Sequence, residues 1–195
     1  MEEALQTPEV VGLISDSIIT ANDKLAFALT QKAFLEPALD SLWSSLTSFR
    51  SLLACLPSDL YETQTQSSPY DSERGFTVVS FLRTLNRADL KRYRTYYAPR
   101  IREFKPKLST IFSMKAMKAL RQATRKPGAL SPCIKKLSWF PRDDLEDHLG
   151  LPHAVKLMSF ADLFLAPATI WSIAFEMFPS TRPVHRFSHC PAVEY

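Results

Sequence analysis

Three side chains near the C-terminus have the types and spacing of a metal site. His185, His189 and Cys190 could present two imidazoles and one thiol to a single ion. A closed four-coordinate site needs a further ligand, and the sequence has no second His or Cys cluster to supply it. Because prolines also surround this stretch, we interpret it as a polar tail and predict no metal and no cofactor.

An acidic run over 143–148 has the residue types of a general acid or base. It consists of Asp143, Asp144, Glu146, Asp147 and His148. No nucleophile signature accompanies it, so a solvated loop is the better interpretation. The chain also has only 4 glycines and lacks the GxGxxG and GxxxxGK[ST] patterns of phosphate-cradling loops. The sequence therefore predicts a protein without catalytic activity.

The net charge of +4 is distributed unevenly along the chain. Residues 83–126 carry 14 Lys and Arg against 2 Asp and Glu, whereas residues 1–82 carry 4 against 11. Over 91–102 tyrosines alternate with cations, as in surfaces that follow phosphates and stack bases. The same pattern also fits a solvated helix face with a buried tyrosine stripe, a surface for an acidic protein, or a complement to the acidic first third.

Four short helices are expected before residue 57, over 8–18, 22–29, 36–46 and 49–56. Thr7 is the expected N-cap of the first, with Pro8 at its first position. The apolar residues of this helix cover more than half its circumference, which is too wide for one packing partner. We expect one face to pack within the bundle: Val10, Leu13 and Ile14. The opposite face needs a second partner, either another protein or residues 76–104 of this chain: Pro8, Val11 and Ile18.

The second half of the chain is expected to mix strands with helices. A polar loop over 57–75 precedes a strand over 76–81. A capping box over 86–89 begins a helix through Tyr97, and a second helix is expected over 113–125. In the first of these helices, Leu90, Tyr93 and Tyr97 form a stripe that we expect to be buried.

A faint repeat flanks the 113–125 helix. Residues 99–104 and 132–137 share the pattern P-x-I-x-x-(F/L), 33 residues apart, and a third unit beginning at Pro167 does not keep the frame. A strand, a helix and a strand at this period are typical of the start of a leucine-rich solenoid. Residues 157–175 contain one charge, Asp162, and we expect two buried strands around a proline turn rather than a membrane span.

The order of residues near the N-terminus resembles the F-box motif. Pro8-Glu9 and a run of aliphatic residues are followed by 23–34 and then by Leu42-Trp43. The stretches 34–43 and 101–104 are also similar to fungal F-box proteins in which leucine-rich-like repeats follow. The resemblance covers roughly residues 7–140, and its specific part is 7–46.

This resemblance implies a non-catalytic adaptor that docks on the Skp-type subunit of a cullin-RING ubiquitin ligase and presents a protein target for ubiquitination. The adaptor-binding residues that it implies are Pro8, Glu9, Val11, Ile14, Ile18, Leu25, Leu29 and Phe34. The chain departs from the family pattern where an F-box meets its adaptor, at Thr7, Thr30 and Gln31, so we expect a weaker contact there.

A target would bind the second segment through its basic side chains. The candidates are Arg92, Arg94, Arg100, Arg102, Lys135 and Lys136. The alternative function is that of a small basic nucleic-acid-binding protein using residues 83–126.

The expected fold is α+β, with an F-box-like helical unit over 1–56, a polar loop over 57–75 and an α/β segment resembling a leucine-rich solenoid over 76–175. A Pro-rich tail over 176–195 is expected to be disordered. The three widely spaced cysteines and the N-terminus without signal-peptide features indicate an intracellular protein, cytoplasmic or nuclear.

Overall fold

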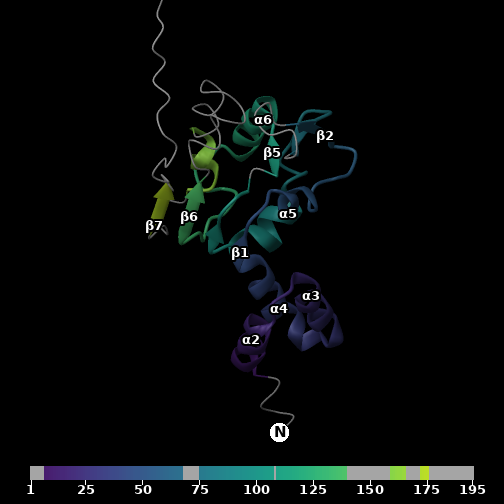
Figure 1. Ribbon diagram of the computed structural model, residues 1–195, viewed down its shortest axis with the longest axis vertical. Helices are drawn as coiled ribbons and strands as arrows, with labels where there is room; N and C mark the ends of the chain where they lie inside the picture. Colours follow the sequence, from purple (N-terminus) through teal and green to yellow (C-terminus); the bar gives the residue numbers. More distant parts are fainter. Residues whose placement is uncertain (1–6, 68–74, 108, 140–158, 166–171, 176–195) are drawn as a thin grey trace, which may run out of the picture.

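A computed structural model describes residues 7–67, 75–107, 109–139, 159–165 and 172–175. Three helices form a distinct group at the N-terminal end of the molecule, here called the helical unit (Figure 1). They are α2 (Pro8–Ser17), α3 (Ala21–Thr30) and α4 (Lys32–Ser44). The remaining elements form a larger group built on two small sheets, here called the sheet body. The chain therefore has the α+β composition that the sequence predicts.

Within the helical unit, α2 and α3 each pack against α4. Pro8 lies in the first turn of α2 as expected, but the Thr7 side chain makes no capping hydrogen bond. The hydroxyl of Thr20 caps α3 instead, accepting a hydrogen bond from the backbone N–H of Asp23 at 3.1 Å. The third helix begins at Lys32, earlier than the expected start at 36, because it continues through Pro37 rather than beginning there.

The four strands of the larger sheet are all parallel. In spatial order they are β1 (Ser45–Leu46), β4 (Glu103–Phe104), β6 (Lys136–Trp139) and β7 (Ser172–Phe175). Phe104 pairs with Leu137, so the two P-x-I-x-x-(F/L) segments lie side by side at their 33-residue period. Leu137 pairs in turn with Ile173, 36 residues further on. The third strand therefore exists although three extra residues disturb the repeat.

A second sheet takes two strands from the chain between β1 and β4 and a third strand from the chain after β4. It contains β2 (Tyr61–Ser67), β3 (Gly75–Phe81) and β5 (Thr110–Phe112). β2 and β3 are antiparallel, and β5 lies parallel to β3 on its other side. The prediction of a polar loop over 57–75 is wrong for the residues of β2. Side chains 62–66 are exposed, and the strand is held by backbone pairing with β3, so it lacks the apolar alternation that reveals a strand.

The core of the sheet body is built around Phe49, which directly precedes α5 (Arg50–Leu53). Its ring lies 5.2 Å from Phe112 and 5.3 Å from Phe104, with Trp139 and Phe164 at 6.3 and 5.8 Å. These five aromatic side chains come from strands and turns that are spread over more than 100 residues of the sequence, from Phe49 to Phe164. They close the sheet body around one aromatic cluster.

The segment over 86–100 confirms the predicted cap and corrects the helix type. The carboxylate of Asp89 accepts from the N–H of Asn86, and the side chain of Asn86 accepts from the N–H groups of Ala88 and Asp89. The helix that follows is η1 (Tyr93–Tyr97), a π-helix, and it continues into η2 (Ala98–Arg100), a 3₁₀ turn. Because Pro99 has no N–H for the carbonyl four residues earlier, the ordinary helical ladder cannot continue here.

The helix predicted over 113–125 is confirmed as α6 (Met114–Thr124). Its cap is Ser113, which accepts from the N–H of Ala116, and it ends at Arg125 with φ of 57°. The prediction of two strands within 157–175 is only half right. Ser159–Leu163 is a short 3₁₀ helix, η3, and Ser172–Phe175 is strand β7. No helix in the described part of the chain is both long and apolar enough to cross a membrane.

Candidate functional site

The helical unit has few buried apolar side chains of its own. Within residues 7–42, the only buried hydrophobic residues are Val11, Ala28 and Ala38. Beside them, the rings of Phe27 and Phe34 stack at 4.8 Å, and the ammonium of Lys24 donates to the Ser41 hydroxyl at 2.8 Å. A valine and two alanines bury little area, so this unit gains little free energy from its own interior.

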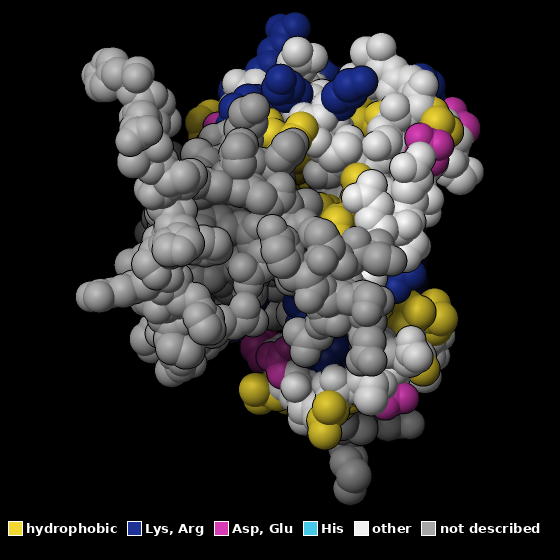
Figure 2. Space-filling model, turned by 45° about the horizontal axis from the view of Figure 1, so that its top comes forward, with side chains coloured by type: hydrophobic (Ala, Val, Ile, Leu, Met, Phe, Trp, Pro, Cys, Tyr) yellow, Lys and Arg dark blue, Asp and Glu magenta, His cyan; other side chains and the backbone are white. Residues whose placement is uncertain are grey.

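The same unit exposes large aliphatic side chains. Leu29 is 74% exposed and Leu13 is 72% exposed, while Leu25 is 47% and Ile19 is 95% exposed. Leu25 and Leu29 are four residues apart on α3 and therefore lie on one face of that helix. We call these four side chains the apolar surface of the helical unit. Figure 2 shows hydrophobic side chains exposed around the end of the molecule that the helical unit forms.

The structure corrects which face of the first helix points inward. Val11, expected on the outer face, is fully buried, whereas Leu13, expected on the inner face, is exposed. The inward stripe of α2 consists of Val11 and Ser15, which lie four residues apart. Because a serine occupies half of that stripe, counting apolar residues alone assigned the helix the wrong face.

The other residues of the predicted adaptor surface divide into two groups. Pro8, Glu9, Leu25 and Leu29 are exposed and accessible to a partner. Ile14, Ile18 and Phe34 are half-buried, and Phe34 is engaged in the stack with Phe27. Leu13 and Ile19 were not predicted as exposed contacts, although the apolar residues on all sides of α2 are a sequence signal for such exposure.

Among the predicted target-binding cations, Arg100 has a structural role. Its guanidinium forms ion pairs with Glu36 and Asp40 of α4, and its side chain is only 14% exposed. It therefore fastens the helical unit to the sheet body and is not free for a target. At this contact, a cation of the basic residues 83–126 pairs with carboxylates of the acidic residues 1–82, as one of the alternatives from the sequence predicts.

The remaining cations of that set are more accessible. Arg92 lies over the ring of Tyr97 and reaches its hydroxyl, and Arg102 donates to backbone carbonyls of its own turn. Lys135 and Lys136 are exposed at the start of β6, while Arg94 is half-buried beside a hollow described below. The structure therefore does not bring the six cations together into one surface.

A depression between the helical unit and the sheet body is lined by residues of both the predicted adaptor-binding set and the predicted target-binding set. Pro8 of the adaptor set and Arg100 and Arg102 of the target set line the same depression of about 380 Å³, between α2, α4 and η2. The two functions that the sequence assigned to separate segments therefore meet at the junction of the helical unit and the sheet body.

The tyrosines of the basic segment face inward rather than outward. Tyr93 is buried, and its hydroxyl donates to the Leu130 carbonyl at 2.6 Å. Tyr97 stacks on Trp43 with ring centroids 4.3 Å apart. Burial raises the pKa of Tyr93, so its hydroxyl stays protonated as the donor. Of the three tyrosines in η1, only Tyr96, at 62% exposed, offers its ring to solvent.

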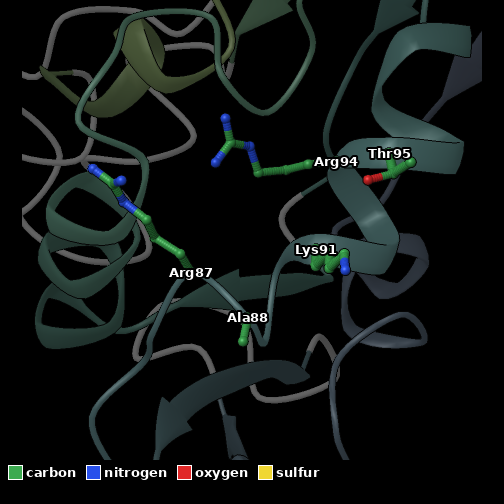
Figure 3. A pocket seen from close by; sticks show the side chains of 5 residues that line it. All are labelled: Arg87, Ala88, Lys91, Arg94 and Thr95. Carbon is green, nitrogen blue, oxygen red and sulfur yellow. The ribbon is translucent and has the colours of Figure 1, made fainter.

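A hollow of about 450 Å³ opens beside the turn that precedes η1 (Figure 3). Arg87, Ala88, Lys91, Arg94 and Thr95 line it. Arg87 and Arg94 extend from different parts of the segment around the same space, and the side chain of Thr95 lies beside Arg94. We call this feature the basic hollow.

Nothing in the described part of the chain has the arrangement of a metal or thiol site. No group of three His, Cys, Asp or Glu side chains could hold a metal there. Burial raises the pKa of the Cys55 thiol to about 11, so it carries little of the reactive thiolate at neutral pH. The two clusters considered first in the sequence, 143–148 and 185–190, lie outside the described residues.

Comparison with known proteins adds no relative to this picture. No family model, curated protein or solved structure matches the chain.

Proposed function

We propose that the chain is a non-catalytic F-box-type adaptor, docking through its helical unit on the Skp-type subunit of a cullin-RING ubiquitin ligase. The observation that carries this proposal is the apolar surface of Leu13, Ile19, Leu25 and Leu29. These side chains are exposed on the part of the molecule with the smallest interior. Water-exposed leucines on such a unit gain free energy when a partner covers them, about 1.5–3 kcal/mol for each fully buried side chain.

The sequence resemblance supplies the identity of that partner, and the geometry is compatible with it. Three short helices with exposed leucines can fill a groove in a second protein. The sheet body would then present a target to the ligase, so the ubiquitin-transfer chemistry would belong to partner enzymes. This role places the protein inside the cell.

Binding of the purified Skp-type adaptor, measured by biolayer interferometry, tests the proposal. The informative variant is Leu25→Asp with Leu29→Asp, because both side chains are exposed and their replacement leaves the folded chain within about 0.5 kcal/mol per site. Affinity should fall by at least about tenfold, since two charges would enter an apolar contact. Val11→Asp is avoided because Val11 is buried.

The matched control is Leu82→Asp, which places a charge at a leucine that is 60% exposed but outside the helical unit. This variant should bind like the parent chain. Absence of binding by the parent chain, or an equal loss in the control, would contradict the proposal.

Nucleic-acid binding by residues 83–126 is the second candidate. In its favour, Lys and Arg side chains gather at the end of the molecule where α6 lies (Figure 2). Against it, Tyr93 is buried and Tyr97 stacks on Trp43, so neither ring is available to stack a base. A steep decrease of oligonucleotide affinity with salt is the result that would favour this candidate.

A further inference from the structure

One strand of the smaller sheet has no neighbouring strand on one of its two sides. β2 (Tyr61–Ser67) is the first strand in the spatial order β2-β3-β5, so among the described strands only β3 pairs with it. Figure 1 shows β2 at the border of the sheet body, on the side away from β7. We call the side of β2 that faces away from β3 the open edge.

The alternation of the β2–β3 ladder determines which backbone groups point to the open edge. At the start of this ladder, the N–H of Leu82 donates to the C=O of Leu60 at 2.9 Å. Because bonded and non-bonded pairs alternate along an antiparallel ladder, the even-numbered residues of β2 bond to β3. The odd-numbered residues therefore turn their N–H and C=O groups toward the open edge: Tyr61, Thr63, Thr65 and Ser67.

The open edge lacks the features that keep exposed sheet edges from pairing. Residues 61–67 include no proline and no lysine, and all seven pair with β3 without a bulge. The other strands at the ends of the described sheets are shorter, since β1 has two residues, β5 three and β7 four. Side chains 62–66 are exposed. β2 is therefore the longest edge strand of the described sheets, and a further strand can add to it.

We propose that two copies of this chain pair through their open edges, antiparallel and about a two-fold axis at Gln64. In this register all seven residues of β2 pair, and each odd-numbered residue faces an odd-numbered residue of the second copy. The backbone groups that point outward would thus exchange hydrogen bonds and join the two three-stranded sheets into one. The proposal goes beyond docking on the ligase, because it concerns an edge of the sheet body.

The side chains of β2 are complementary to themselves in this register. The only charged residue of the strand, Glu62, faces Gln66 of the second copy, so the two carboxylates do not oppose each other. Thr63 faces Thr65 of the second copy, and such threonine pairs stabilise neighbouring strands. At the axis Gln64 faces its own copy, and its amide is both a donor and an acceptor. This self-complementarity favours a second copy over a foreign strand.

Sedimentation equilibrium of the full chain measures the association. Concentrations from about 1 to 500 µM bracket the Kd of about 10–100 µM that we expect for an interface below the standard size. The average mass should rise from one chain, 22.2 kDa, toward two chains and stop there, because a two-fold contact uses both open edges. A monomer at every concentration, or a mass that continues to rise beyond two chains, would overturn the proposal.

Two double variants test the register. Thr63→Lys with Thr65→Lys places lysines opposite each other and should weaken the dimer by at least about tenfold. The matched control is Thr63→Lys with Thr65→Glu, at the same exposed positions, in which each introduced lysine faces an introduced glutamate. The control should dimerise at least as tightly as the parent chain. Equal dimerisation of the two variants would contradict the register and the proposal.

A disulfide at the axis provides a test that does not depend on charge. Gln64→Cys places two thiols in a non-bonded pair whose Cα atoms lie about 4.5 Å apart, which a disulfide can span. In the matched control, Gln66→Cys, the two thiols are four residues out of register and about 13 Å apart. With a mild oxidant, Gln64→Cys should form more covalent dimer than Gln66→Cys or the parent chain. Equal yields from the two variants would rule out the axis at Gln64 and overturn the proposal.

Leu25→Asp with Leu29→Asp separates this proposal from docking on the ligase. This variant should dimerise like the parent chain, because both leucines lie on α3 and not on β2. If it is monomeric while the parent chain dimerises, the two copies meet through the apolar surface of the helical unit, and the pairing of open edges is wrong.

Discussion

The helical unit and the sheet body differ in how far their large apolar side chains are buried. The sheet body encloses Phe49, Phe104, Phe112, Trp139 and Phe164 in one cluster and has cations on its surface. The helical unit buries one valine and two alanines before Trp43 and leaves four large aliphatic side chains in water. The sheet body therefore completes its core internally, whereas the helical unit keeps most of its large aliphatic area in water.

The largest expected effect comes from opening the aromatic cluster. Phe49→Ala should reduce the free energy of unfolding by about 3–5 kcal/mol, because the ring is 2% exposed and contacts four other aromatic side chains. Val11→Ala, the matching deletion in the helical unit, should cost about 1–2 kcal/mol. Urea denaturation of both variants measures the difference. Equal losses would mean that the two regions share one core.

The strands of the sheet body could be predicted in part from the sequence. The 33-residue repeat of P-x-I-x-x-(F/L) predicts two neighbouring parallel strands, and Phe104 does pair with Leu137. Three strands were missed. β1 and β5 contain only two and three residues, which is too short to show a period. β2 is stabilised by its backbone partners rather than by buried side chains.

The candidate site was harder to predict from the sequence, because the exposure of a helix face depends on which other element packs against that helix. Leu25 and Leu29 were predicted as exposed contacts and are exposed. Val11 is buried and Leu13 is exposed, the reverse of the prediction, because α4 packs against the side of α2 that carries Ser15. Likewise, the sequence shows that Arg100 is basic but does not show that two carboxylates some 60 residues earlier engage it.

Helix caps provide a smaller test within each region. Thr20→Ala and Ser113→Ala should each cost about 1 kcal/mol, since each side chain accepts a backbone N–H at the start of a helix. Thr7→Ala should cost close to nothing, because its side chain makes no such bond. Thermal unfolding followed by circular dichroism compares the three variants. A loss for Thr7→Ala equal to the other two would contradict this assignment.

The junction of the two regions should depend on salt. Arg100→Gln removes the ion pairs to Glu36 and Asp40 and should cost about 0.5–1 kcal/mol at low ionic strength. The difference from the parent chain should shrink in 1 M NaCl, because both carboxylates are largely exposed and screened. Arg102→Gln, which removes the same charge without breaking a pair to α4, is the control. A loss independent of salt would assign Arg100 a packing role instead.

The smallest effect is expected at acid pH in the sheet body. The hydrogen bonds from Arg83 and from the N–H of Asn86 hold the pKa of Asp89 below its usual range. The carboxylate therefore stabilises the fold above about pH 4, its unfolded value, and that contribution is lost as the pH falls further. Asp89→Asn should be less stable than the parent chain at pH 7 and approach it near pH 3. Denaturation at both pH values tests this, and a constant difference would contradict the role of the charge.

The direct passage from α4 into β1 has a mechanical consequence. α4 ends at Ser44 and the first strand begins at Ser45, so no linker separates the leucines of the helical unit from the parallel sheet. A 13-residue helix is about 20 Å long, and α4 connects the helical unit to the sheet as one continuous element. A partner bound to the helical unit would therefore also determine the orientation of the sheet body. One residue inserted into the last turn of α4 would rotate the helical unit by about 100° relative to the sheet and separate Glu36 and Asp40 from Arg100.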